Sequence, residues 1–160
     1  MTVTYSQIAT QTLGSAASSV TFSSISGTYT DLVLVINGST TIDQNYRLRF
    51  NSDTASNYSY TRLTGDGTSA ASERATGTAF IHISAGDHTN TGVFIVNIQN
   101  YSNTTTYKTT LSRHNIAASN VGTYVGLWRS TSAITSVTIT TSSTTFTSGS
   151  TFTLYGIKAA

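Results

Sequence analysis

The chain has 160 residues, a net charge of +2 and neither cysteine nor proline. This length suits one domain with its own core, and the lack of cysteine excludes disulfides, thiolate metal sites and cysteine nucleophiles. Only 9% of the residues are charged, against about 25% in a typical globular protein. The basic residues are scattered singly, whereas nucleic-acid binders usually carry a basic stripe, so we expect no nucleic-acid partner.

The first 19 residues are expected to form an N-terminal arm or a first strand, and residues 20–160 a single domain. The start of the chain lacks the charged and apolar regions of a signal peptide. The longest apolar run, residues 32–36, is far shorter than the ~20 residues that span a membrane. Residues 7–17 come nearest to a helical repeat, and only weakly. We therefore expect synthesis in a cytoplasm and no membrane partner.

A period of two residues dominates the rest of the chain. Tyr46, Leu48 and Phe50 alternate with Arg47 and Arg49, as in a half-buried strand. Similar runs, separated by Gly, Asn and Ser, predict about ten strands, the spacing of a β-sandwich or jelly roll. The predicted strands are residues 20–25, 32–36, 46–50, 58–63, 79–83, 93–98, 107–113, 124–129, 134–140 and 152–157. We predict an all-β chain that forms a single, jelly-roll-like β-sandwich.

The longest stretch without a strand pattern is residues 64–77, which are rich in Gly, Ser, Thr and Ala. We predict a loop that projects from one end of the sandwich. Loops of this length are functional or disordered. Residues 140–150 are expected to form a long connection between the last two strands.

Titratable residues are too few and too scattered to suggest an active site. The chain has six carboxylates and three histidines, and catalysis needs such groups held together. We interpret His82, His88 and His114 as ordinary structural histidines, although a Ser-His-Asp triad is assembled in space and leaves no local signature. We predict no enzyme activity and no cofactor.

A calcium site is the one metal site that the sequence suggests. Asp66 lies between two glycines and could offer oxygen ligands to calcium together with Asp53 or Asp43 from other loops. A plain turn is the favoured interpretation, so we predict no metal.

Aromatic residues are the better candidates for function. Tyr58 and Tyr60 share a strand face with Arg62, and Tyr124 shares a face with Trp128. Exposed Tyr and Trp with polar neighbours suit sugar stacking or a protein interface, and core packing is the alternative for each. These five residues are our candidate interface, and replacing Trp128 with Ala is expected to weaken assembly.

Two stretches resemble a known group of proteins. The first is Asn45-Tyr46-Arg47-Leu48-Arg49-Phe50-Asn51-Ser52-Asp53, which continues through Asn57-Tyr58-Ser59-Tyr60. The second runs from residues 134–139 through Phe146 to Gly149-Ser150-Thr151-Phe152-Thr153-Leu154-Tyr155-Gly156-Ile157. Together they resemble small β-sandwich virion structural proteins of tailed bacteriophages, many from aquatic hosts, over most of the chain from Leu32 onward. In that family the second stretch closes the sandwich as a final strand.

The resemblance implies a non-enzymatic particle protein located in the virion. Its members serve as capsid decoration (cement) proteins and as parts of tail fibres, and the family carries no catalytic residues to transfer. Because no fibrous or coiled-coil segment is visible in this sequence, we favour decoration of the capsid. The partners are then the major capsid protein and the chain itself, as a homotrimer. A tail-fibre module that binds a receptor or a host glycan is the alternative.

Overall fold

The computed structural model, which describes residues 4–85, 88–117 and 119–158, is a sandwich of two antiparallel sheets. The described residues form twelve strands and no helix. The larger sheet contains, in spatial order, β1 (Tyr5–Thr12), β12 (Thr151–Ile157), β3 (Asp31–Gly38), β8 (Gly92–Gln99), β9 (Lys108–Ile116), β10 (Asn120–Trp128), β5 (Tyr58–Gly65) and β6 (Ala70–Thr78). The smaller sheet contains β2 (Ser19–Phe22), β11 (Val137–Thr140), β4 (Arg47–Phe50) and β7 (Ile81–His82).

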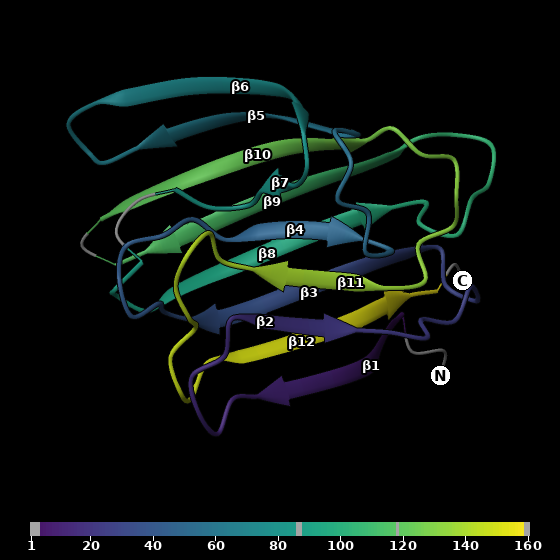
Figure 1. Ribbon diagram of the computed structural model, residues 1–160, viewed down its shortest axis with the longest axis horizontal. Coiled ribbons are helices and arrows are strands. Elements are labelled where there is room, and N and C mark those ends of the chain that lie inside the picture. Colours follow the sequence, from purple (N-terminus) through teal and green to yellow (C-terminus); the bar gives the residue numbers. More distant parts are fainter. Residues whose placement is uncertain (1–3, 86–87, 118, 159–160) are drawn as a thin grey trace.

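The two sheets differ in size, and the smaller one covers only part of the larger (Figure 1). In the view of Figure 1 the strands β2, β11 and β4 lie over the middle of the larger sheet, and the β5–β6 hairpin extends beyond them. The predicted β-sandwich is confirmed. Each of the ten predicted strands overlaps a strand of the structure.

One strand, β6, has no counterpart in the prediction. Residues 64–77, expected to be a loop, form the end of β5, a turn and most of β6, which pairs along the whole of β5. The composition of β6, rich in Ala, Ser and Gly, has little intrinsic strand preference, so its pairing with β5 holds it extended. Within residues 1–19, for which an arm or a first strand was expected, Tyr5–Thr12 form the edge strand β1 and pair with β12.

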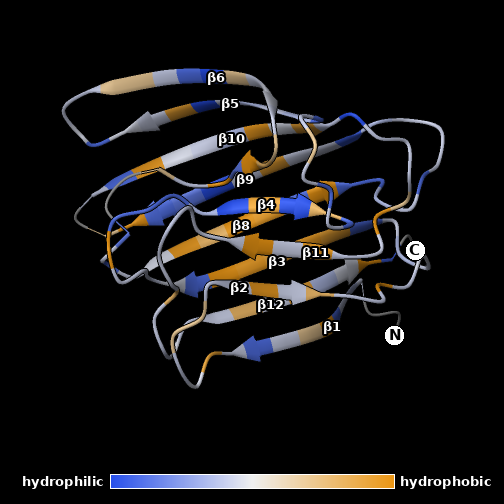
Figure 2. Ribbon diagram, in the orientation of Figure 1, coloured by the Kyte–Doolittle hydropathy of each residue, from blue (hydrophilic) through white to orange (hydrophobic). Residues whose placement is uncertain are grey.

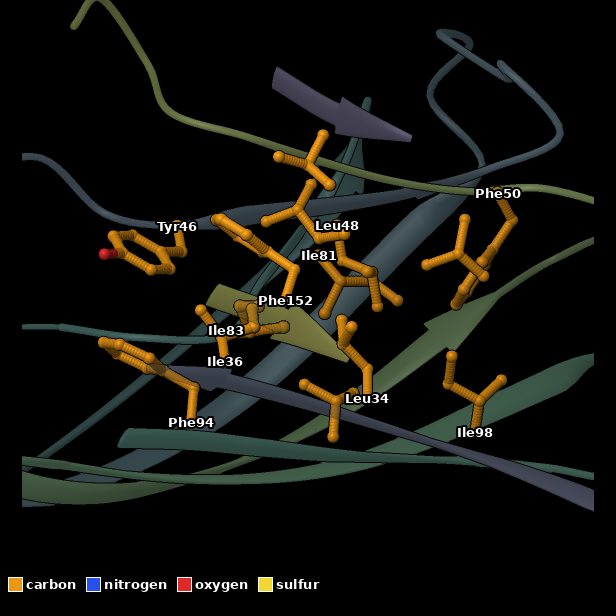
Figure 3. Packing of buried hydrophobic residues seen from close by; sticks show 14 of the residues in the cluster. Leu34, Ile36, Tyr46, Leu48, Phe50, Ile81, Ile83, Phe94, Ile98 and Phe152 are labelled. Atoms are coloured by element: carbon orange, nitrogen blue, oxygen red, sulfur yellow. The ribbon is translucent and has the colours of Figure 1, made fainter. Parts of the chain in front are cut away.

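The core lies between the sheets and is built by alternation of inward and outward residues along most strands. Apolar residues are concentrated on β3 and β8 (Figure 2). Leu48 and Phe50 of the smaller sheet point toward the larger sheet, and the Tyr46 ring lies over that of Phe94, with centroids 4.5 Å apart (Figure 3). Eight of the described core side chains are aromatic and less than 2% exposed: Tyr46, Phe50, Tyr58, Phe94, Tyr101, Tyr124, Phe146 and Phe152.

Strands β9 and β10 carry small and polar residues on their inner side. Thr110, Ser112 and His114 of β9 are buried, and on β10 the inward positions alternate between glycine and a large ring. A Cβ atom on Gly126 would lie 2.5 Å from Thr110 Oγ1 and 2.6 Å from Ile81 Cγ2. Glycine at this position therefore lets the smaller sheet approach closely, and the rings next to it fill the remaining space.

A hydrogen-bonded turn after β4 joins the two sheets at one end. The Trp128 indole Nε1 donates to Asp53 Oδ2 at 2.7 Å, and the same carboxylate accepts from Asn57 Nδ2 and from the Ala55 backbone N–H. Burial acts to raise the pKa of Asp53, but these hydrogen bonds outweigh it and hold the pKa below its ordinary value. Tyr58 Oη donates to the backbone carbonyl oxygens of Asp53 and Phe50. We call this arrangement the Asp53 turn.

Replacing Asp53 with Ala should lower the free energy of unfolding by about 2 kcal/mol, because the buried Trp128 indole and the half-buried Asn57 amide then lose their acceptor. Urea unfolding followed by Trp128 fluorescence measures the change. Asp66→Ala is the matched control, since the Asp66 carboxylate accepts four hydrogen bonds against three for Asp53, but only from Thr68 and Ser69 in its own exposed turn. We expect the control to cost much less, because its turn is fully exposed to water. An equal loss in both variants would contradict a special role for the Asp53 turn.

Candidate functional site

The five candidate interface residues are brought together on the inner face of the β5–β10 pair. Trp128 lies opposite Tyr58 and Tyr124 opposite Arg62 in the strand register. The rings of Tyr58 and Trp128 stack with centroids 6.2 Å apart, and those of Tyr60 and Tyr124 lie 6.4 Å apart. The structure therefore groups the residues that the sequence selected.

The four aromatic members of this group are buried, so their predicted role at an interface is wrong for the folded chain. Tyr58 and Tyr124 are 0% exposed, Trp128 2% and Tyr60 8%. Side chains without accessible surface cannot reach a partner, and they instead fill the space beside Gly126. Replacing Trp128 with Ala would open a cavity in the core, a loss of stability rather than of a docking contact.

Arg62, the fifth candidate, is partly exposed and forms an ion pair. Its Nη2 contacts Glu73 Oε2 on the neighbouring strand β6, and Tyr60 Oη donates to Glu73 Oε1 at 3.2 Å. Burial raises the pKa of Tyr124 to about 12, and the nearby Arg62 only partly offsets this effect. Arg62 is thus occupied in holding β5 to β6.

A polar hollow of about 420 Å³ adjoins this ion pair. It lies where the segment before β4 meets the ends of β5 and β10. Its lining consists of Asp43, Gln44, Asn45, Arg62, Thr64, Ala85 and Asn120. These groups can donate and accept hydrogen bonds, but no aromatic side chain lines the hollow, so it lacks the stacking platform that sugars favour.

The three histidines have packing roles in the described structure. The His82 ring lies 5.1 Å from that of Tyr60 and 5.0 Å from that of Phe80. Burial, with help from Arg47 and Arg62, lowers the His82 pKa to about 4. His114 Nε2 lies 2.7 Å from Asn120 Oδ1, and the His88 ring packs near Tyr46 and Phe94.

Lys108 is a buried cation without a carboxylate partner among the described residues. Its Nζ donates to the backbone carbonyl oxygens of Thr106 at 2.7 Å and Thr131 at 3.2 Å. Burial lowers the Lys108 pKa. The side chain thus ties together the loops before β9 and after β10.

The three aspartates considered for calcium do not come together. The Asp66 carboxylate is used within its own turn and that of Asp53 in the Asp53 turn, while Asp43 contacts His88 at 3.4 Å. Within residues 4–85, 88–117 and 119–158 no group of three or more His, Cys, Asp or Glu is placed to hold a metal ion. In the same residues no helix is long and apolar enough to cross a membrane.

The surface with the clearest potential for binding is the side of the larger sheet that faces away from the smaller sheet, which we call the outer face. Here β9, β10 and β5 expose aliphatic side chains, whereas their inner positions include Gly126 and Ser112. Val125 lies opposite Leu111, and Leu63 lies opposite Thr123, so the exposed aliphatic residues are neighbours. Their exposed fractions are 58% for Leu63, 44% for Leu111, 56% for Val121 and 55% for Val125.

A groove of about 560 Å³ runs along the outer face between β6 and β9. Val125 and Leu127 lie in it, and Arg74 and Arg129 supply its cationic groups. Arg129 Nη2 donates to Ser59 Oγ and to Thr76 Oγ1, both at 3.2 Å. Hydroxyl groups therefore position this guanidinium, and no carboxylate of the described residues pairs with it.

The charge on the outer face is entirely of one sign around the groove. The pairing register places Arg74, Arg113 and Arg129 on this face. In the described part of the chain the ion pairs are Arg62–Glu73 and His88–Asp43, so none of these three arginines pairs with a carboxylate. In the sequence, this face is marked by aliphatic residues that alternate with Gly and Ser on β9 and β10. Our choice of candidate interface residues did not use this pattern.

Comparison with known proteins adds no family to this description. No protein-family model and no curated protein sequence matches the chain.

The folded chain should lose stability as the pH falls from 6.5 to about 4. In this range the unfolded chain binds a proton at His82 that the folded chain does not bind, because the folded-state pKa is about 4 instead of 6.5. The lowered pKa of His114 acts in the same direction. Thermal unfolding between pH 7 and pH 4 measures the slope, which should be smaller for His82→Asn. An unchanged slope in that variant would remove His82 as a source of the effect.

Proposed function

We propose that this chain is a non-enzymatic structural protein of a tailed-phage particle, a capsid decoration (cement) protein that binds the outer surface of the head and stabilises it. The observation that carries the proposal is the outer face of the larger sheet. Neighbouring aliphatic residues are exposed there, whereas aliphatic surface of this kind is usually covered by a partner. A flat, rigid sandwich with such a face is suited to binding by surface complementarity.

The sequence resemblance supports the same proposal through residues that have structural roles. Asn51 Oδ1 accepts from the backbone N–H groups of Thr135 and Ser136, and Asp53 organises the turn to Trp128. In the second stretch, Gly156 lies beneath the Tyr29 ring, where a Cβ atom would be 2.3 Å from Tyr29 Cγ. Both stretches thus specify the sandwich, and the resemblance is one of fold.

A tail-fibre module that binds a receptor or a carbohydrate is the second candidate. The polar hollow around Asn45, Arg62 and Asn120 favours it. The aromatic residues first considered for stacking on sugars are in the core, which weakens this candidate.

Immunogold labelling of intact phage particles with antibody against this chain tests the proposal. Gold spread over the head is the expected result, because a cement protein repeats across the whole capsid surface. Gold confined to the tail would support the receptor-binding candidate, and particles without gold would contradict both.

A second test is the heat resistance of the head. Particles grown without a functional gene for this chain should release their DNA at a lower temperature than wild-type particles, because a bound protein stabilises the state that it binds. Adding the purified chain back should restore the wild-type temperature. Identical release temperatures would contradict a cementing role.

A further inference from the structure

We propose that the groove between Arg74 and Arg129 on the outer face is the docking site for an acidic, partly aliphatic segment of a different protein. The proposal rests on the function given above, since it assigns the contact surface of the same particle-bound module. It specifies what that function leaves open, namely which face binds and the chemistry of the surface it meets.

Charge complementarity is the first argument. Arg74 and Arg129 line the groove, Arg113 lies on the same face two strands away from β5, and none is neutralised by a carboxylate of the described residues. The side chain of Arg129 is already held by Ser59 and Thr76, so little conformational entropy is lost when it binds an anion. Arginine forms paired hydrogen bonds with carboxylates, which gives such a contact direction as well as charge.

The shape and composition of the groove favour a polypeptide over a sugar. Its floor is aliphatic, from Val125 and Leu127, and it continues into the exposed side chains of Leu111 and Leu63. The rings of Tyr58, Tyr124 and Trp128 point to the opposite side of the sheet. Aliphatic side chains of a partner can be buried on this floor. Among the residues that line the groove the aromatic one is Tyr60, which is 8% exposed, so a sugar would find little ring surface to stack on.

A second copy of this chain does not offer the required surface. Its described carboxylates are dispersed, and each already has a partner within the chain. Asp31 accepts from the Asn100 backbone N–H, Asp43 contacts His88, Asp53 and Asp66 hold their turns, and Glu73 pairs with Arg62. Two outer faces placed together would also bring like charges into contact. The complementary surface therefore belongs to another protein.

Binding to heads tests the inference, with particles grown without a functional gene for this chain as the probe. The purified full chain, the variant R74Q/R129Q and the control R49Q/K158Q are compared by co-sedimentation at low and high salt. Both variants lose two positive charges, but Arg49 lies on the smaller sheet and Lys158 follows β12. We expect R74Q/R129Q to bind at least about tenfold more weakly and with less salt dependence, and the control to bind within about twofold of wild type.

The other possible outcomes show whether the proposed function or only the docking site is wrong. If the wild-type chain does not bind these heads, the proposed function fails. If it binds and R74Q/R129Q binds as tightly, the function stands and the groove is not the docking site. Binding of a glucuronic-acid oligosaccharide that is lost in R74Q/R129Q would overturn the protein partner in favour of an acidic glycan. Self-association lost in the same variant would assign the groove to a second copy.

A further pair of variants protects the test against misfolding. R74Q alone changes an exposed residue of the edge strand β6, and Val125→Thr keeps the side-chain shape while it adds a hydroxyl group to the groove floor. Both should retain the wild-type unfolding midpoint and bind heads more weakly. Full binding by both variants would overturn the inference even if R74Q/R129Q were unstable.

Discussion

The structure depends on the packing of large aromatic rings against glycines and small hydroxyl residues between two sheets of unequal size. Gly126 lies against Ile81 and Thr110, and the rings of Tyr124 and Trp128 on either side of it fill the gap that the glycine leaves. This exchange of large and small residues keeps the interior between the sheets densely packed. It also determines the surface, because side chains that alternate with Gly126 on β10, such as Val125, must point outward.

Because few residues are charged, hydrogen bonds between hydroxyl groups replace many of the ion pairs that link neighbouring strands in other proteins. Threonine pairs form hydrogen bonds between Thr10 and Thr153 and between Thr21 and Thr138, each at 3.0 Å. Such cross-strand pairs stabilise a sheet and fix its register. Because few side chains of the molecule are charged, the three arginines of the outer face contribute a large share of its electrostatic field.

The fold was largely predictable from the sequence, because alternation of period two over ten segments leaves few architectures other than a sandwich. The strand β6 was not predictable from composition, since its Ala, Ser and Gly residues become a strand only through pairing with β5. The candidate site was misjudged for a related reason. Alternation along the strands does not tell whether a face of the sheet is buried or exposed. For Tyr58, Tyr60, Tyr124 and Trp128 the position of the smaller sheet decides that the face is buried.

The sequence indicates the exposed outer face only through strands whose apolar residues lie outside and whose polar residues lie inside. On β9 the polar Ser112 is inside and Leu111 outside, the reverse of a strand with one solvent-facing side. Strands that carry aliphatic residues on their outer side indicate a sheet that makes apolar contacts on both of its faces. In this chain the described residues provide a cover for the inner side only, and we assign the outer side to a partner.

The orientation of the sandwich on the particle tests this account most directly. Electron cryomicroscopy of the virion, at a resolution that separates the two sheets, would show which sheet lies against the head. The account predicts that the outer face of β9, β10 and β5 contacts the capsid and that β2, β11 and β4 face the solvent. A sandwich attached through the smaller sheet, with Leu111 and Val125 open to solvent, would contradict it.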